Sequence, residues 1–305
     1  MINKDCPGPE SADAGTTDNC KGCPNQNICS SKEQVKKDLT KINDNLKDIK
    51  SKFLILSGKG GVGKSTVAAN LAYTFLKKDL EIGVLDLDIT GPSIPKILGV
   101  EREIVHSSNS GWSPVWVQEN LCCMSIGFLS QPDQAILWRG PKKNGLIESF
   151  LEKVEWDVDV LIIDTPPGTS DEHLSIVSYL KESGITGAIL VSTSSQESIL
   201  DVTRELKFCK RVDIPIIGIV ENMSSFTCKC GKISKIFSGN RVEKLAAEYN
   251  IKFLGSIPLD PKLGKSCDFG ANFISQNPES PTSLAYQRIL QQIDEVVKCT
   301  SSTKD

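Results

Sequence analysis

The sequence predicts an α/β fold in which helices cover both faces of a doubly wound, mostly parallel β-sheet. Three observations lead to this prediction. From Lys52 onward, short apolar runs alternate with segments of helical spacing, the runs are predominantly apolar, and a glycine-rich loop follows the first of them. Continuous apolar runs indicate strands buried on both faces, and their alternation with helices indicates right-handed crossover units.

Six apolar runs are predicted as parallel strands: 53–56, 82–87, 160–164, 188–191, 214–220 and 253–257. Apolar residues at spacings of three and four predict helices between them, at 67–78, 144–154, 174–182, 198–210 and 241–249. Residues 113–127 alternate like a pair of strands, and 283–297 are predicted to form a closing helix. The predicted organisation is a cysteine-rich segment (1–31), an amphipathic linker helix (32–51), a main domain (52–299) and a tail (300–305).

Composition restricts the partners and the compartment. The chain has 305 residues and a net charge of −3 with both signs mixed, so neither nucleic acid nor an anionic membrane is expected as a main partner. No apolar run approaches the ~20 residues of a membrane span, and the first ten residues do not resemble a signal peptide, which predicts a cytoplasmic protein. Eleven cysteines in a reducing compartment favour metal ligation or chemistry over disulfides.

A phosphate-binding loop is predicted directly after the first strand, where 58–65 match G-x-x-x-x-G-K-[ST]. Lys64 is expected to reach the β- and γ-phosphates, and the Ser65 hydroxyl to bind Mg²⁺. The alternative, a glycine turn without a ligand, is disfavoured by the strand, loop and helix around the motif. The residues expected to contact nucleotide here are Gly58, Gly60, Gly61, Val62, Gly63, Lys64, Ser65 and Thr66.

Lys59 adds a second lysine to this loop, and 59–66 match K-G-G-x-G-K-[ST], the pattern of deviant Walker A (SIMIBI-type) P-loop NTPases. The resemblance implies that Lys59 reaches the nucleotide of a second subunit, as an arginine finger does, in a nucleotide-sandwich dimer.

Two acidic segments follow predicted strands, where doubly wound sheets bind ligands. By analogy with this group, Asp88 in 86–93 orients the attacking water. Asp86 either lies near Mg²⁺ or caps a helix. In 161–169, Asp164 holds Mg²⁺ through water and the Gly168 N–H senses the γ-phosphate. The chain has no Asn-Lys-x-Asp guanine-reading sequence, so ATP is the expected nucleotide.

Four cysteines, Cys6, Cys20, Cys23 and Cys29, lie within 24 residues in the spacing C-x13-C-x2-C-x5-C. Four thiolates bind either Zn²⁺ or a [4Fe-4S] cluster, and the spacing does not separate these or exclude disulfides and free thiols. A second candidate is Cys228-Lys229-Cys230, which supplies two ligands and needs a second subunit to complete four; two ordinary loop thiols are the alternative.

Four further cysteines have weaker interpretations. Cys122, Cys123 and Cys209 are predicted to be small core residues. Cys267 is placed in a loop after the last strand, where it meets the nucleotide site or takes part in transient transfer.

Four segments, 59–66, 84–93, 164–173 and 221–223, together resemble the Mrp/NBP family of iron–sulfur cluster scaffold ATPases, specifically a member with an N-terminal four-cysteine motif. The resemblance implies ATP-dependent assembly of [4Fe-4S] clusters and their transfer to cytosolic and nuclear apoproteins. It implies a stable [4Fe-4S] cluster on the N-terminal cysteines, a labile one bridging two subunits at Cys228 and Cys230, and an adenine contact by Asn222.

The implied partners are a second copy of the chain, a shorter homologous scaffold ATPase, recipient apoproteins and cluster-targeting factors. One departure weakens the bridging site, because the family has C-x-x-C where this chain has C-x-C. A ParA/MinD-type positioning ATPase, a reductase similar to the nitrogenase iron protein and a zinc-binding adaptor with a degenerate P-loop remain as alternatives.

Overall fold

The computed structural model describes residue 17 and residues 39–108, 111–129, 140–169, 171–228 and 230–302. The chain divides into two compact units, 1–40 and 41–305. Of the first unit the structure describes Thr17, Leu39 and Thr40, so the four N-terminal cysteines lie outside the described residues. The second unit contains the main domain.

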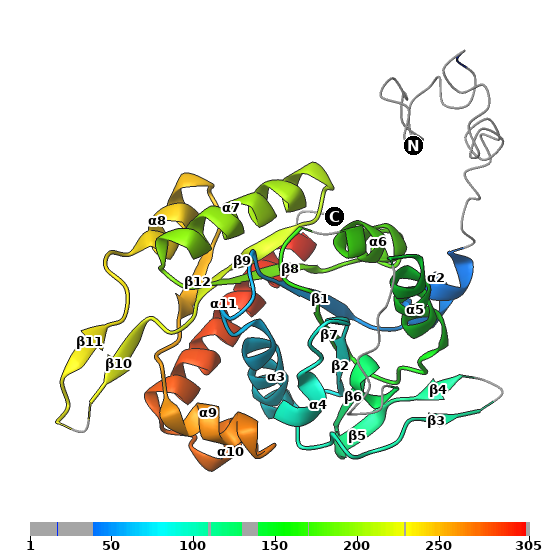
Figure 1. Cartoon of the computed structure of the whole chain (residues 1–305), viewed down its shortest axis with the longest axis horizontal. Helices are drawn as coiled ribbons and strands as arrows, with labels where there is room; N and C mark the ends of the chain where they lie inside the picture. The colour runs from blue at the N-terminus through cyan, green and yellow to red at the C-terminus, as the bar shows by residue number, and fades with distance from the viewer. Residues whose placement is uncertain are drawn as a thin grey trace. The chain divides into compact units, whose positions relative to one another are not determined.

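An eight-stranded sheet forms the centre of this unit (Figure 1). Its strands lie in the order β12 (Phe253–Ser256), β9 (Ile216–Glu221), β8 (Gly187–Ser192), β1 (Ser51–Leu56), β7 (Val160–Asp164), β2 (Ile82–Asp86), β6 (Leu121–Ser125) and β5 (Val115–Gln118). Neighbouring strands are parallel except β5 and β6, which are antiparallel. The doubly wound sheet and the strand pair predicted within 113–127 are therefore confirmed.

Helices cover both faces of the sheet, and Figure 1 shows α3 and α11 on one side and α5, α6, α7 and α8 on the other. Their bounds are α3 Lys64–Phe75, α5 Gly140–Lys153, α6 Asp171–Leu180, α7 Gln196–Arg211, α8 Arg241–Glu248 and α11 Pro281–Ser302. The helix predicted within the linker is described as α2 (Thr40–Leu46). Each predicted crossover helix is thus present.

Several short elements were not predicted. They are the helices α4 (Ile94–Ile97), α9 (Pro261–Asp268) and α10 (Phe273–Gln276), the 3-10 turns η2 (Leu76–Lys78) and η3 (Ile126–Phe128), and two hairpins, β3 (His106–Ser107) with β4 (Trp112–Ser113) and β10 (Ser225–Thr227) with β11 (Ile233–Lys235). Cys267 lies in α9, so its placement in a loop was wrong. Pro261 at the first helical position and Asp260 as N-cap, whose side chain accepts the Lys262 N–H, stabilise this helix.

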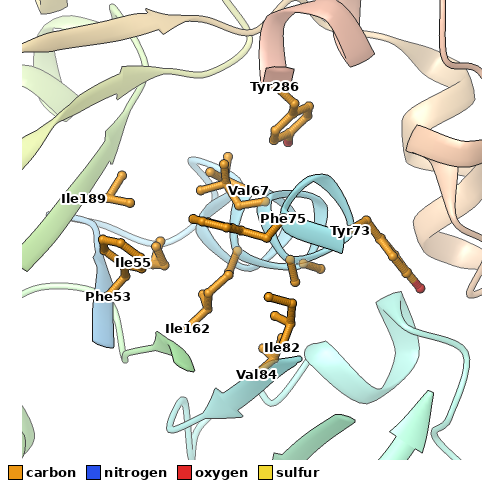
Figure 2. Close-up of a cluster of buried hydrophobic side chains, with 14 of the residues drawn as sticks. Phe53, Ile55, Val67, Tyr73, Phe75, Ile82, Val84, Ile162, Ile189 and Tyr286 are labelled. Carbon is orange, nitrogen blue, oxygen red and sulfur yellow. The ribbon is translucent and has the colours of Figure 1, made fainter. Parts of the chain in front are cut away.

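The core beneath α3 fixes this helix against the sheet (Figure 2). Val67 and Phe75 of α3 are buried with Ile162 of β7, and the Phe75 ring stacks on Phe53 of β1 with centroids 5.8 Å apart. Fully burying one such side chain contributes about 1.5–3 kcal/mol. This packing holds the loop between β1 and α3 in place.

Two backbone contacts connect α9 to distant parts of the fold. Gly99, which follows α4, and Gly270, which follows α9, lie so close that a Cβ added to Gly270 would be 2.1 Å from the Gly99 Cα. Both have positive φ angles, 76° and 65°. At the other end of α9, the Leu259 N–H donates to the Ser225 carbonyl of β10 at 2.7 Å. No helix within the described residues has the length and apolar character required to cross a membrane.

Candidate functional site

The loop between β1 and α3 has the backbone of a phosphate-binding loop. Gly61 and Gly63 have φ angles of 82° and 84°, a region that favours glycine. Gly58 packs so tightly on α7 that a Cβ there would lie 2.2 Å from the carbonyl carbon of Asp201. The geometry of the loop therefore requires three of the predicted glycines, Gly58, Gly61 and Gly63.

This loop forms one wall of an open pocket of about 340 Å³. The other walls come from the segments after β2 and β7 and from α4 and α9. The lining residues are Ser57, Lys59, Gly60, Gly61, Gly63, Lys64, Ser65, Thr66, Asp88, Ser93, Lys96, Ile97, Pro167, Cys267 and Asp268.

Asp164 joins the two phosphate-loop side chains. Its Oδ1 accepts from Lys64 Nζ at 2.6 Å, and its Oδ2 accepts from Ser65 Oγ at 2.5 Å. Asp164 is fully buried and Lys64 is 6% exposed. Burial raises the pKa of Asp164, and the Lys64 ammonium opposes this shift. Mg²⁺ prefers oxygen ligands, and in nucleotide sites it binds a hydroxyl and the phosphates, with a carboxylate close by. Ser65 and Asp164 therefore fit the predicted ion.

Asp86 lies beside Asp164 in the sheet register. Its carboxylate accepts hydrogen bonds from the N–H groups of Asp88 and Ile94 and from the Ser125 hydroxyl, at 3.0–3.3 Å. Burial, and then the neighbouring Asp164, raise the pKa of Asp86 to about 7. These contacts favour the helix-capping interpretation, because the Ile94 N–H is the first of α4.

Asp88, in contrast, lines the pocket, and its Oδ1 accepts from the Thr90 hydroxyl at 2.8 Å. It therefore lies where the sequence predicts a water-orienting carboxylate.

The segment after β7 is fixed to the phosphate loop. The Thr165 hydroxyl donates to the Ile55 carbonyl at 2.9 Å, and the Gly168 N–H donates to the Ser57 carbonyl at 2.8 Å. In this conformation the Gly168 N–H is thus directed at the protein backbone. Sensing of a γ-phosphate by this group stays a prediction and requires this hydrogen bond to break.

Lys59 is held within its own chain. Its Nζ lies 3.0 Å from Oε2 of Glu197, in the first turn of α7. Both side chains have solvent access, at 36% for Lys59 and 82% for Glu197. The predicted role of Lys59 in a second subunit requires this ion pair to open.

Asn222 contacts the phosphate loop from behind. It is 5% exposed, and its amide donates to the Val62 carbonyl at 2.9 Å. A Cβ on Gly63 would lie 2.3 Å from this amide nitrogen. Asn222 is not among the residues that line the pocket, so its adenine contact stays a prediction.

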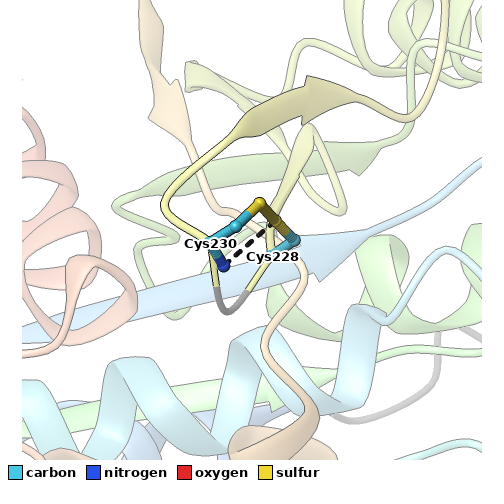
Figure 3. The surroundings of a disulfide bond; sticks show 2 residues. All are labelled: Cys228 and Cys230. Atoms are coloured by element: carbon cyan, nitrogen blue, oxygen red, sulfur yellow. Dashed lines mark hydrogen bonds between the residues drawn. A yellow bond between two sulfur atoms is a disulfide. The ribbon is translucent and has the colours of Figure 1, made fainter.

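Cys228 and Cys230 lie in the turn of the β10–β11 hairpin, and the structure joins their sulfur atoms in a disulfide with Cα atoms 5.3 Å apart (Figure 3). The Cys230 N–H also donates to the Cys228 sulfur at 3.3 Å. The hairpin thus brings the pair together, and ligation belongs to its reduced form. Within the described ranges no group of three or more His, Cys, Asp or Glu side chains is arranged to hold a metal ion.

Four of the remaining cysteines divide into two kinds. Cys122, Cys123 and Cys209 are fully buried, which confirms their assignment to the core. Cys267 lines the pocket and hydrogen-bonds to Thr66 and Asn70 of α3, so it meets the nucleotide site. Burial raises the pKa of the Cys267 thiol.

Sequence reasoning missed two charged residues in the pocket wall, Lys96 and Asp268. Lys96 lies on α4, three residues beyond the end of the acidic segment 86–93, and belongs to no motif. Asp268 carries no local signal, because its position depends on the contact between α4 and α9.

The fold and the pocket define a nucleotide-binding P-loop NTPase of the MinD/ParA-like class. A family model described as ParA, NUBPL iron-transfer P-loop NTPase, matches residues 48–294. The chain belongs to this family.

Solved structures agree with this assignment. The nucleotide-binding protein from Archaeoglobus fulgidus, determined in complex with ADP, is 34% identical, with a TM-score of 0.69 over 81% of this chain and 95% of that one. The cell division ATPase MinD from Pyrococcus furiosus is 20% identical, with a TM-score of 0.59 over 81% and 100%. A ParA family ATPase from Chlorobium tepidum is 17% identical, with a TM-score of 0.56 over 82% and 98%. The last two show likeness of fold alone.

Proposed function

We propose that this protein is a cytosolic ATPase that assembles [4Fe-4S] clusters on its cysteines and transfers them to cytosolic and nuclear apoproteins. The observation that supports it best is the presence, in one iron-transfer NTPase chain, of an intact phosphate pocket and a hairpin that presents Cys228 and Cys230 side by side. The N-terminal cysteines supply four further thiols in the sequence.

The chain's own groups account for nucleotide binding and hydrolysis. The phosphate-loop N–H groups and Lys64 bind the phosphates, while Asp88 orients a water for attack. Mg²⁺, held by Ser65 with Asp164 behind it, would supply charge stabilisation on the phosphate oxygens. The hydrogen bonds from Lys64 and Ser65 to Asp164 couple the phosphate loop to the segment after β7. Loss of the γ-phosphate therefore alters the conformation of the segment that carries Gly168.

The iron–sulfur cluster bound at the hairpin is the cargo that the protein transfers, and ATP hydrolysis governs that transfer. Two thiolates from each of two subunits complete the four that a [4Fe-4S] cluster needs, so the hairpin site is incomplete without a second copy or a shorter homologous scaffold. The N-terminal cysteines are proposed to hold a more stable cluster. Recipient apoproteins and targeting factors are then the further partners.

Anaerobic reconstitution with iron and sulfide tests the proposal, with iron per chain and Mössbauer spectra as readouts. Cys20→Ala/Cys23→Ala is expected to remove a tightly bound cubane cluster, and Cys228→Ala/Cys230→Ala a labile one. Cys299→Ala, which removes a cysteine outside both sets, serves as control and is expected to retain both. Zinc in place of iron at the N-terminal site, with no iron retained elsewhere, would overturn the proposal in favour of an adaptor or a positioning ATPase.

A further inference from the structure

The phosphate pocket has three lysines in its wall, and two of them already have carboxylate partners. Lys64 pairs with Asp164 and Lys59 with Glu197. The third is Lys96, for which no ion pair is found among the described residues. An exposed lysine without a carboxylate partner, in the wall of a pocket built to hold phosphate, is free to bind an anion there.

The position of Lys96 ties it to the reacting end of the pocket. Lys96 lies on α4, which begins directly after the segment containing Asp88. The first N–H of α4 is bonded to Asp86, whose strand neighbour in register is Asp164. A ligand held by Lys96 therefore engages the helix that continues from the Asp86–Asp88 segment.

The charge of the pocket also favours this role. Asp88 and Asp268 are the acidic side chains that line it, against the three lysines. Since Lys59 and Lys64 each form an ion pair with a carboxylate, much of their positive charge is balanced before nucleotide binds. A polyphosphate brings several negative charges, and an additional lysine lowers the cost of placing them in the pocket.

We propose that Lys96 binds the phosphates of the bound nucleotide and so connects the nucleotide directly to α4. Lys96 is thus a third nucleotide-binding lysine, outside the phosphate-loop motif. The proposal depends on nucleotide binding alone and not on the cluster chemistry proposed above.

Titration calorimetry of full-length protein with MgADP and MgATP tests this role. Lys96→Ala is expected to weaken binding about tenfold at low salt, the loss typical of one charge-assisted hydrogen bond, and Lys96→Arg to retain most of the affinity. Lys265→Ala is the matched control, since Lys265 is an exposed lysine of α9 that does not line the pocket. Equal effects of Lys96→Ala and Lys265→Ala would overturn the proposal.

A second measurement uses the unmodified protein and does not depend on the folding of a variant. Lysine acetylation is followed by mass spectrometry with and without MgADP. Lys96 is expected to be protected by nucleotide while Lys265 is acetylated at the same rate in both cases. An unchanged acetylation rate at Lys96 would contradict the proposal even where the calorimetry agreed with it.

Discussion

Lys59 and Glu197 form an ion pair of 3.0 Å within one chain, between a phosphate-loop lysine and the first turn of α7. Because both side chains are partly or largely exposed, this pair contributes at most about 1 kcal/mol. It competes with any contact that Lys59 makes in a second subunit.

Glu197→Gln is therefore expected to favour nucleotide-dependent dimers, by up to about 30-fold in the dimerisation constant, because a symmetric dimer opens two such pairs of about 1 kcal/mol each. Sedimentation velocity with a non-hydrolysable ATP analogue measures this. Asp201→Asn is the control, because it breaks an exposed pair with Arg204 on the same helix without touching Lys59. Equal dimerisation of the two variants would show that the ion pair does not restrain Lys59.

Asp86 and Asp88 are expected to differ in function although they are two residues apart. Asp88→Asn removes the carboxylate that orients water, so hydrolysis should fall by at least about 100-fold. Asp86→Asn keeps one acceptor oxygen for the Ile94 N–H and should lower the free energy of unfolding by about 1–2 kcal/mol while hydrolysis persists. ATPase assays and thermal melts of both variants separate these effects. A stably folded but inactive Asp86→Asn protein would show that Asp86 takes part in hydrolysis.

Glu205 on α7 predicts a pH dependence of stability. It is fully buried, neither carboxyl oxygen has a hydrogen-bond partner among the residues that the structure describes, and burial raises its pKa to about 8. The folded protein then keeps a proton that the unfolded chain releases near pH 4.5, so this residue lowers stability as the pH rises from about 4.5 to about 8.

Glu205→Gln should remove this dependence, with a gain on the order of 4 kcal/mol at pH 8 and little change at pH 4.5. Urea unfolding across this pH range is the measurement, and Glu248→Gln, an exposed residue on α8, is the control. A difference between Glu205→Gln and wild type that does not vary with pH would show that Glu205 ionises normally in the folded state.

Alkylation of Cys267 should report on the occupancy of the pocket. The thiol lies in the pocket wall against Thr66, and its raised pKa makes it slow to react at neutral pH and faster in alkaline solution. MgADP is expected to slow its reaction with iodoacetamide at least about tenfold by closing access. Peptide mass spectrometry measures this, with Cys230 in the exposed hairpin as the internal reference under reducing conditions. Equal rates with and without nucleotide would place Cys267 outside the occupied volume.

The sequence allowed the central sheet to be predicted because most of its strands are buried on both faces and are predominantly apolar, as in 160–164, where Asp164 is the one polar residue. The hairpins β3–β4 and β10–β11 escaped prediction because they consist of two or three residues each, most of them exposed, with no apolar pattern. Asp260 and Pro261 did signal the start of α9, but Gly264 and the absence of a long apolar stripe concealed the helix.

The candidate site was predictable where one local motif contains all its residues, as in the phosphate loop. Contacts between distant segments were not predictable: Lys59 and Glu197 are 138 residues apart in sequence, and nothing local to either indicates the other. Lys96 and Asp268 likewise line the pocket through the packing of α4 against α9. A motif search therefore finds the pocket residues that lie in one continuous segment and misses those that tertiary packing brings to the pocket.

Helix α9 touches the pocket at Cys267 and begins two residues after Leu259, whose backbone N–H donates to the Ser225 carbonyl in the cysteine hairpin. Eight helical residues span about 12 Å, so these two contacts lie on one short, stiff segment. Any coupling free energy between these two sites is reciprocal: each site changes the equilibrium at the other by the same factor. If nucleotide alters the reduction potential of the Cys228–Cys230 pair, then reducing that pair alters nucleotide affinity by the same factor, and the redox state of the hairpin becomes a determinant of how much nucleotide the protein holds.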